Sequence, residues 1–197
     1  VSINLTFAED LKCLQSYDLF KQITAEGREI EKTGTVQQLL DYYDKVYFDR
    51  LFKNLHPNET FNLGNWMSND TYLYSIKTMF EYNRQNLKTT KKETYDLLPA
   101  TANYIEGNKE ICIVPVKNIV EDVQFDSGII YVRYINSDKW RMIYYLDNDD
   151  KKVIQEFLPE LRNDTVLPKF KSHVIKKCVI GVELGFNFKF KSHVIKK

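Results

Sequence analysis

The sequence predicts an α+β fold in which three N-terminal helices pack on a C-terminal antiparallel sheet. The main observation is a change in hydrophobic period near Pro99, from about four residues to about two. The composition agrees, because 43% hydrophobic residues with only 7 Gly and 5 Pro can form a buried core. At 197 residues the chain fits one domain, which we place at residues 1–168, with a C-terminal strand extension over residues 169–197.

The first helix is predicted to begin at a capping-box pattern, Thr6 followed by Glu9. Gly27 is expected to weaken this helix, and Gly34 with its flanking threonines is expected to end it. Its apolar residues recur at helical spacing and are Phe7, Leu11, Leu14, Leu19, Phe20 and Ile23.

Two further helices are predicted before any strand. The second begins at another capping box, Thr35 to Gln38, and its apolar stripe extends to Leu55, before His56 and Pro57. The third contains residues 72–87, after a loop rich in Asn and Gly.

The second half alternates apolar and polar residues, which is typical of strands. Pro115 indicates a sheet edge or a bulge, because proline cannot donate to a strand ladder. The Asp-Asn-Asp-Asp run at residues 147–150 is expected to cap a short helix near residues 150–161. The expected strands cover residues 102–105, 110–117, 129–135 and 139–146, with turns at 106–109, 127–128 and 137–138.

The tail contains a repeat of nine residues, because residues 169–177 recur unchanged as residues 189–197. Two copies are too few for a solenoid, so a recent duplication or a sequence artefact explains them better. Between the copies, residues 182–190 alternate as a further strand would.

Helices followed by a curved antiparallel sheet resemble, in element order, the cone-shaped fold of the nuclear transport factor and ketosteroid isomerase superfamily. The resemblance implies a cone-like arrangement and carries over no site residue. A two-layer sandwich of another family fits the same order of elements.

Charge and motifs exclude several classes of function. Lys and Arg total 28 against 27 Asp and Glu, so no nucleic-acid partner is expected, and no apolar run is long enough for a transmembrane helix. No phosphate loop, nucleophile elbow or metal-ligand spacing occurs, so we predict no cofactor, no metal and no catalytic residue. At most one disulfide can form among Cys13, Cys112 and Cys178, and the spacing of these cysteines in the sequence does not indicate which two are paired.

Four glycosylation sequons indicate a secretory route. The alternative is an AT-rich bacterial gene, in which abundant Asn and Thr create sequons that are never modified. The candidate glycosylation residues are Asn4, Asn58, Asn69 and Asn163.

One candidate ligand site lies on the strongest predicted hairpin. A turn at 137–138 would place Arg133 among aromatic side chains on one face, where it could meet an anion or stack on a ring. The plainer interpretation is that Arg133 lies at the rim of the core beside Trp140. The residues of this candidate site are Tyr131, Arg133, Trp140 and Tyr144.

These observations predict two alternative functions. The first is a non-enzymatic protein-binding domain, secreted or envelope-associated, such as a toxin-neutralising partner. The second is a binder of a small apolar or anionic ligand, or an enzyme without a motif that uses an aromatic pocket with Asp or Glu as base. An exposed aromatic patch would favour the first function, and a deep pocket with a buried carboxylate would favour the second.

Overall fold

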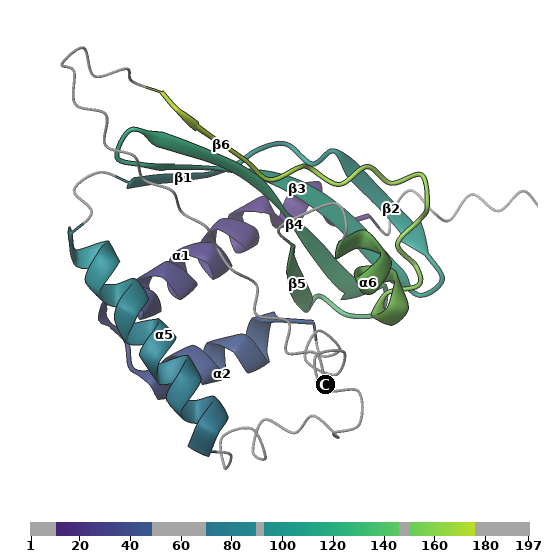
Figure 1. Ribbon diagram of the computed structural model, residues 1–197. Helices are drawn as coiled ribbons and strands as arrows, with labels where there is room; N and C mark the ends of the chain where they lie inside the picture. Colours follow the sequence, from purple (N-terminus) through teal and green to yellow (C-terminus); the bar gives the residue numbers. More distant parts are fainter. Residues whose placement is uncertain (1–10, 49–69, 90–92, 146–149, 176–197) are drawn as a thin grey trace, which may run out of the picture.

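The computed structural model describes residues 11–48, 70–89, 93–145 and 150–175, and it has the predicted α+β architecture (Figure 1). Among these residues, three α-helices precede the main sheet: α1 (Tyr17–Thr33), α2 (Val36–Val46) and α5 (Asp70–Thr89). The strands are β1 (Glu93–Leu97), β2 (Ala102–Glu106), β3 (Lys109–Val120), β4 (Val123–Tyr134), β5 (Trp140–Tyr145) and β6 (Lys171–Val174). Helix α6 (Asp150–Phe157) follows β5 and is the short helix predicted near residues 150–161.

The sheet is antiparallel and is built on the long β3–β4 hairpin. The strand order is β1-β3-β4-β5, while β2 also pairs with β3 and β6 also pairs with β4. Pro115 lies between the stretches of β3 that pair with β1 and with β2, where its carbonyl accepts from Leu98 N–H at 2.9 Å. Proline is tolerated there because no strand needs its missing N–H.

Both faces of the sheet are covered. Figure 1 shows α1 running beneath the curved sheet, and one core joins α1 and α2 to this face. The other core joins the opposite face to α6 and the segment that follows it. The first core includes Phe20, Ile23, Tyr42, Val114, Ile129 and Tyr131, and the second includes Ile111, Ile130, Ile143, Ile154, Phe157 and Leu158.

Helix α1 begins later than predicted. Leu14 lies in a 3₁₀ turn (Leu14–Ser16) and is 73% exposed, so the prediction that residues 11 and 14 continue a helical stripe is wrong. The backbone N–H groups of Lys12 and Cys13 donate to the Glu110 carboxylate, which holds this segment against β3. A Cys13–Cys112 disulfide holds it there as well. The predicted cap at residue 6 lies outside the described residues.

Gly27 lies inside α1 and allows α2 to approach closely. A Cβ atom at this position would lie 2.6 Å from the Tyr42 hydroxyl oxygen, which donates to the Ile23 carbonyl at 2.9 Å. The glycine does not end the helix, which continues to Thr33.

Helix α2 begins as predicted and ends earlier. The Thr35–Gln38 capping box is confirmed, with both reciprocal hydrogen bonds present. The prediction that the helix continues to residue 55 is wrong, because Tyr47 turns into an extended conformation and forms a parallel bridge with Met142. Phe48 N–H then donates to the Met142 carbonyl, so pairing with the edge of β5 replaces the next helical turn.

Helix α5 confirms the third prediction and packs against the other two helices. Its Phe80 is buried against Leu39 and Leu40 of α2. Arg84 Nε donates to the Glu31 carbonyl of α1 at 3.4 Å, and a second nitrogen of Arg84 donates to the Gly34 carbonyl.

Two predictions about the strands need correction. The sheet begins before Pro99, because β1 starts at Glu93. Hydrophobic alternation does not identify this strand, because only Tyr95 and Leu97 among its five residues are apolar. The turn predicted at residues 127–128 is wrong, because β4 passes straight through it. At Gly128 a Cβ atom would lie 2.9 Å from Tyr145 Cζ, so the glycine serves packing instead of turning the chain.

The hairpin between β4 and β5 has the predicted faces and a longer loop. Arg133 pairs with Trp140 and Tyr131 with Met142, so the register differs by two residues from that of a two-residue turn. An even shift leaves each side chain on its predicted face. In the tail, the first copy of the repeat contains β6, whereas the second copy and the predicted strand at 182–190 lie outside the described residues.

Candidate functional site

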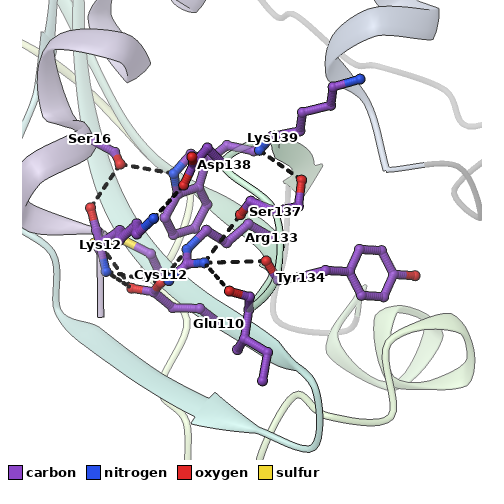
Figure 2. Close-up of polar contacts among 12 residues, drawn as sticks. Lys12, Ser16, Glu110, Cys112, Arg133, Tyr134, Ser137, Asp138 and Lys139 are labelled. Carbon is purple, nitrogen blue, oxygen red and sulfur yellow. Dashed lines mark hydrogen bonds and ion pairs between the residues drawn. A yellow bond between two sulfur atoms is a disulfide. The ribbon is translucent and has the colours of Figure 1, made fainter. Parts of the chain in front are cut away.

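Arg133, the predicted ligand contact, is fully buried and faces a carboxylate. Its Nε donates to Glu110 Oε2 at 2.6 Å, and neither side chain is exposed (Figure 2). Its Nη1 donates to the carbonyls of Tyr134, Ile135 and Ser137 at 3.2 to 3.3 Å. Arg133 therefore joins strand β3 to the loop between β4 and β5.

Glu110 collects hydrogen bonds from two segments of the chain. Besides Arg133, it accepts from the backbone N–H groups of Lys12 and Cys13, at 2.8 and 2.9 Å. Figure 2 shows these donors converging on the carboxylate beside Cys112. The arrangement is that of a buried charge whose oxygens are occupied by protein donors, which is a structural role.

The four predicted site residues divide into two groups. Trp140 donates from Nε1 to Ser16 Oγ at 2.9 Å, and Tyr131 stacks on Phe20 with ring centroids 3.8 Å apart. These two residues and Arg133 lie beneath the start of α1, in the buried core. Tyr144 lies elsewhere, in the wall of a cleft, and 37% of its surface is exposed.

This cleft lies between α1, α2 and the concave face of the sheet, and we call it the tyrosine cleft. Its volume is about 420 Å³. Helix α1 contributes one wall and α2 a second, and strands β1, β3, β4 and β5 contribute the floor and the remaining wall. Its lining includes Arg28, Glu31, Tyr43, Tyr47, Tyr95, Asn118 and Tyr144.

Tyrosines from three elements meet in the cleft. The rings of Tyr43 and Tyr47 are edge to face with centroids 4.9 Å apart, and Tyr47 lies 5.8 Å from Tyr144. The hydroxyls of Tyr95 and Tyr144 approach to 3.4 Å, although their strands are separated by β3 and β4. The curvature of the sheet therefore brings its two edges together over the cleft.

Two charged side chains, Arg28 and Glu31, line the cleft, and two more, Glu93 and Lys32, lie next to Arg28 or Glu31 in the structure. Arg28 forms an ion pair with Glu93, and Lys32 Nζ lies 3.8 Å from the same carboxylate. The Arg28 guanidinium also lies over the Tyr95 ring, 4.9 Å from its centroid. Glu31 lines the cleft, and no residue in the described part of the chain donates a hydrogen bond to its carboxylate.

Burial sets the protonation of these groups. It raises the pKa of the Glu31 carboxyl, against the opposing effect of Arg28 and Lys32. Burial also raises the pKa of Tyr43 to about 12 and raises the pKa values of Tyr47, Tyr95 and Tyr144. The tyrosines are therefore neutral hydroxyls at physiological pH, and Glu31 is a carboxyl group able to exchange a proton with a bound molecule.

Asn118 adds a polar group to the floor of the cleft. Its Oδ1 is buried and has no hydrogen-bond partner among the described residues. A buried polar atom without a partner is unfavourable by about 1–3 kcal/mol unless a bound molecule or water satisfies it.

Sequence reasoning found Tyr144 and missed the other residues of the cleft. One signal was present on α1, where Thr24, Gly27, Arg28 and Glu31 recur at spacings of three and four residues and form a polar stripe. No sequence pattern indicates that β1 and Tyr47 line the cleft, because their positions depend on which distant segments meet in the fold.

Of the predicted glycosylation residues, Asn163 alone lies in the described part of the chain. It is exposed in a turn, while the Thr165 of its sequon is buried and shares a hydrogen bond of 2.9 Å with the Tyr104 hydroxyl. Its modification stays a prediction, as do those at Asn4, Asn58 and Asn69, which lie outside the described residues.

Within residues 11–48, 70–89, 93–145 and 150–175, no group of three or more His, Cys, Asp or Glu side chains is placed to hold a metal ion. No helix in these ranges is long and apolar enough to cross a membrane. Comparison with protein-family models, with curated proteins and with solved structures finds no match for this chain.

Proposed function

We propose that the protein binds a small organic molecule in the tyrosine cleft. The observation that carries this proposal is a concave, aromatic-walled space of about 420 Å³ whose lining includes Glu31 and Asn118, and Asn118 Oδ1 is buried without a partner among the described residues. Ligand sites commonly have volumes of about 300–1,000 Å³ and combine aromatic walls with a few polar groups. The cleft has both properties.

The composition of the walls supports binding over simple packing. Tyr43, Tyr47, Tyr95 and Tyr144 present neutral hydroxyls and ring surface around the same space. Such side chains lose little conformational entropy when they contact a ligand, because they have few rotatable bonds. The ion pair with Glu93 holds Arg28 in position in the lining of the cleft.

The test is a fragment screen by ligand-observed NMR on the full chain, followed by titration of the hits. Replacing Tyr144→Ala removes one wall of the cleft, and we expect it to weaken hit binding by about tenfold or more, which corresponds to about 1.4 kcal/mol. The matched control is Tyr134→Ala, since Tyr134 is also an exposed tyrosine of the sheet (46%) but does not line the cleft.

Hits that bind the Tyr144→Ala variant as tightly as the unchanged protein would contradict the proposal. The proposal would also be contradicted if no hit responded to Tyr144→Ala while remaining unaffected by Tyr134→Ala.

The protein-binding function has separate support on α5. Three large apolar side chains of this helix are exposed: Tyr74 at 71%, Met79 at 54% and Tyr82 at 60%. Exposed aromatic and Met side chains are enriched where proteins contact one another. This surface is distinct from the tyrosine cleft, so Tyr144→Ala leaves it unchanged and separates the two functions.

A further inference from the structure

We infer that the tyrosine cleft recognises an organic cation, an amine or quaternary ammonium group, with the Glu31 carboxylate as counter-ion and tyrosine rings as the surrounding walls. This inference rests on the proposed function and adds the chemical class of the ligand. It follows from how the charges of the cleft are paired, from its unsatisfied acceptors and from its aromatic surfaces.

The pairing of charges leaves Glu31 as the acidic group open to a ligand. Arg28 and Lys32, its neighbours on α1, both face Glu93 of β1. Arg84 of α5 comes near, but its guanidinium donates to the backbone carbonyls of Glu31 and Gly34. The basic groups around the cleft are thus held by other acceptors.

The remaining elements that face Glu31 contribute neutral groups. Helix α2 presents Tyr42 and Tyr43, the residue after it is Tyr47, and β1 presents Tyr95. All four lie close enough that the charge of Glu31 raises their pKa values. A carboxylate among neutral hydroxyls in a space of low polarity attracts a cation more strongly than it would in water.

Two groups of the cleft lining are acceptors without a donor, and the buried Tyr145 hydroxyl, which can donate or accept, also lacks a partner among the described residues. The Glu31 carboxylate and Asn118 Oδ1 both lack a hydrogen-bond donor among the described residues. An ammonium group carries donors and no acceptor, so it complements them. An anionic ligand would instead meet Glu31 and would have to displace Glu93 from Arg28.

The aromatic walls suit the same ligand. Cations bind over the faces of aromatic rings within about 6 Å of the centroid, and cages of several rings hold quaternary ammonium groups. Arg28 already lies 4.9 Å above Tyr95, which shows that this ring accepts a cation. Further rings come from Tyr47 and from Tyr43 and Tyr144, whose centroids lie 4.9 and 5.8 Å from that of Tyr47.

The experiment uses choline and its neutral isostere 3,3-dimethylbutan-1-ol, titrated into the full chain and followed by NMR or calorimetry. The two probes have nearly the same shape, so a difference in affinity reports the charge. We expect choline to bind at least tenfold more tightly, and Glu31→Gln to remove most of that difference. The matched control is Glu29→Gln, because Glu29 is an exposed glutamate of the same helix outside the cleft.

The pH dependence supplies a second readout, because choline itself does not titrate near neutrality. Protonation of Glu31 removes the counter-ion, so choline affinity should fall as the pH is lowered through the raised pKa of Glu31. In Glu31→Gln this dependence should be absent.

Equal affinity for the two isosteres in the unchanged protein would overturn the inference without the need for any variant. If other fragments then bind in a manner sensitive to Tyr144→Ala, the cleft is a ligand site for another chemical class and the proposed function stands. If no fragment binds, both proposals fail.

Discussion

Arg133 is a charged side chain at the centre of the molecule, and Glu110 is the reason that it can lie there. Neither side chain is exposed, and their closest atoms are 2.6 Å apart. Removing a charge from water is unfavourable, and a facing charge with additional hydrogen bonds offsets this effect. The pair therefore contributes little on balance, yet either member alone would destabilise the fold.

Replacing Arg133→Met should lower the free energy of unfolding by about 3–5 kcal/mol, because Glu110 would remain buried without its partner. Urea unfolding at neutral pH measures this change. The control is Lys12→Met, which breaks the exposed pair between Lys12 and Asp138 and should cost about 0–1 kcal/mol. A loss as small as that of the control would mean that the buried Glu110 does not depend on Arg133.

At the scale of elements, α2 links the helical layer to the tyrosine cleft. It has only 11 residues, too few for an isolated helix to be stable in water, so its cap and its packing must hold it. The Thr35 hydroxyl accepts from Gln38 N–H at 3.2 Å, and the Gln38 side chain accepts from Thr35 N–H at 2.7 Å. This capping box fixes where Tyr43 and Tyr47 enter the cleft.

Replacing Thr35→Ala should destabilise the protein by about 1 kcal/mol, because one end of α2 loses its cap. Thermal or urea unfolding measures the loss. Thr33→Ala is the matched control, since the Thr33 hydroxyl bonds only to Glu29 one turn earlier in α1 and is exposed. Equal effects of the two substitutions would argue against the capping role.

At the scale of the whole molecule, the Cys13–Cys112 disulfide joins the segment before α1 to the centre of the sheet. The two cysteines are 99 residues apart in sequence and both are fully buried. A crosslink over a loop of this length restricts the unfolded chain strongly, so its loss is expected to cost about 2–5 kcal/mol. It also holds Lys12 and Cys13 where their N–H groups reach Glu110.

The double replacement of Cys13 and Cys112 by Ala should therefore lower the urea midpoint of unfolding, and a reductant should lower that of the unchanged protein by a similar amount. The double variant should not respond to reductant, which serves as the internal control. An unchanged midpoint of the original protein after complete reduction would contradict this role.

The sequence by itself determined the class of the fold, the Thr35–Gln38 cap, helices α5 and α6, the β2–β3 hairpin and the faces of the β4–β5 hairpin. These features depend on side-chain periodicity or on contacts between residues close in sequence. Periodicity also survives a register shift of two residues, which is why the faces were correct although the loop is longer than predicted.

Only the tertiary structure decided where α2 ends, that β4 passes through Gly128, and that Arg133 faces Glu110. It also decided that Glu31, Tyr47, Tyr95 and Tyr144 surround one cleft. Each of these outcomes depends on a partner distant in sequence, such as Met142 for Tyr47 or Tyr145 for Gly128. Local sequence patterns indicate which secondary structure a segment prefers. The geometry of a site depends instead on which segments meet when the sheet curves around its helices.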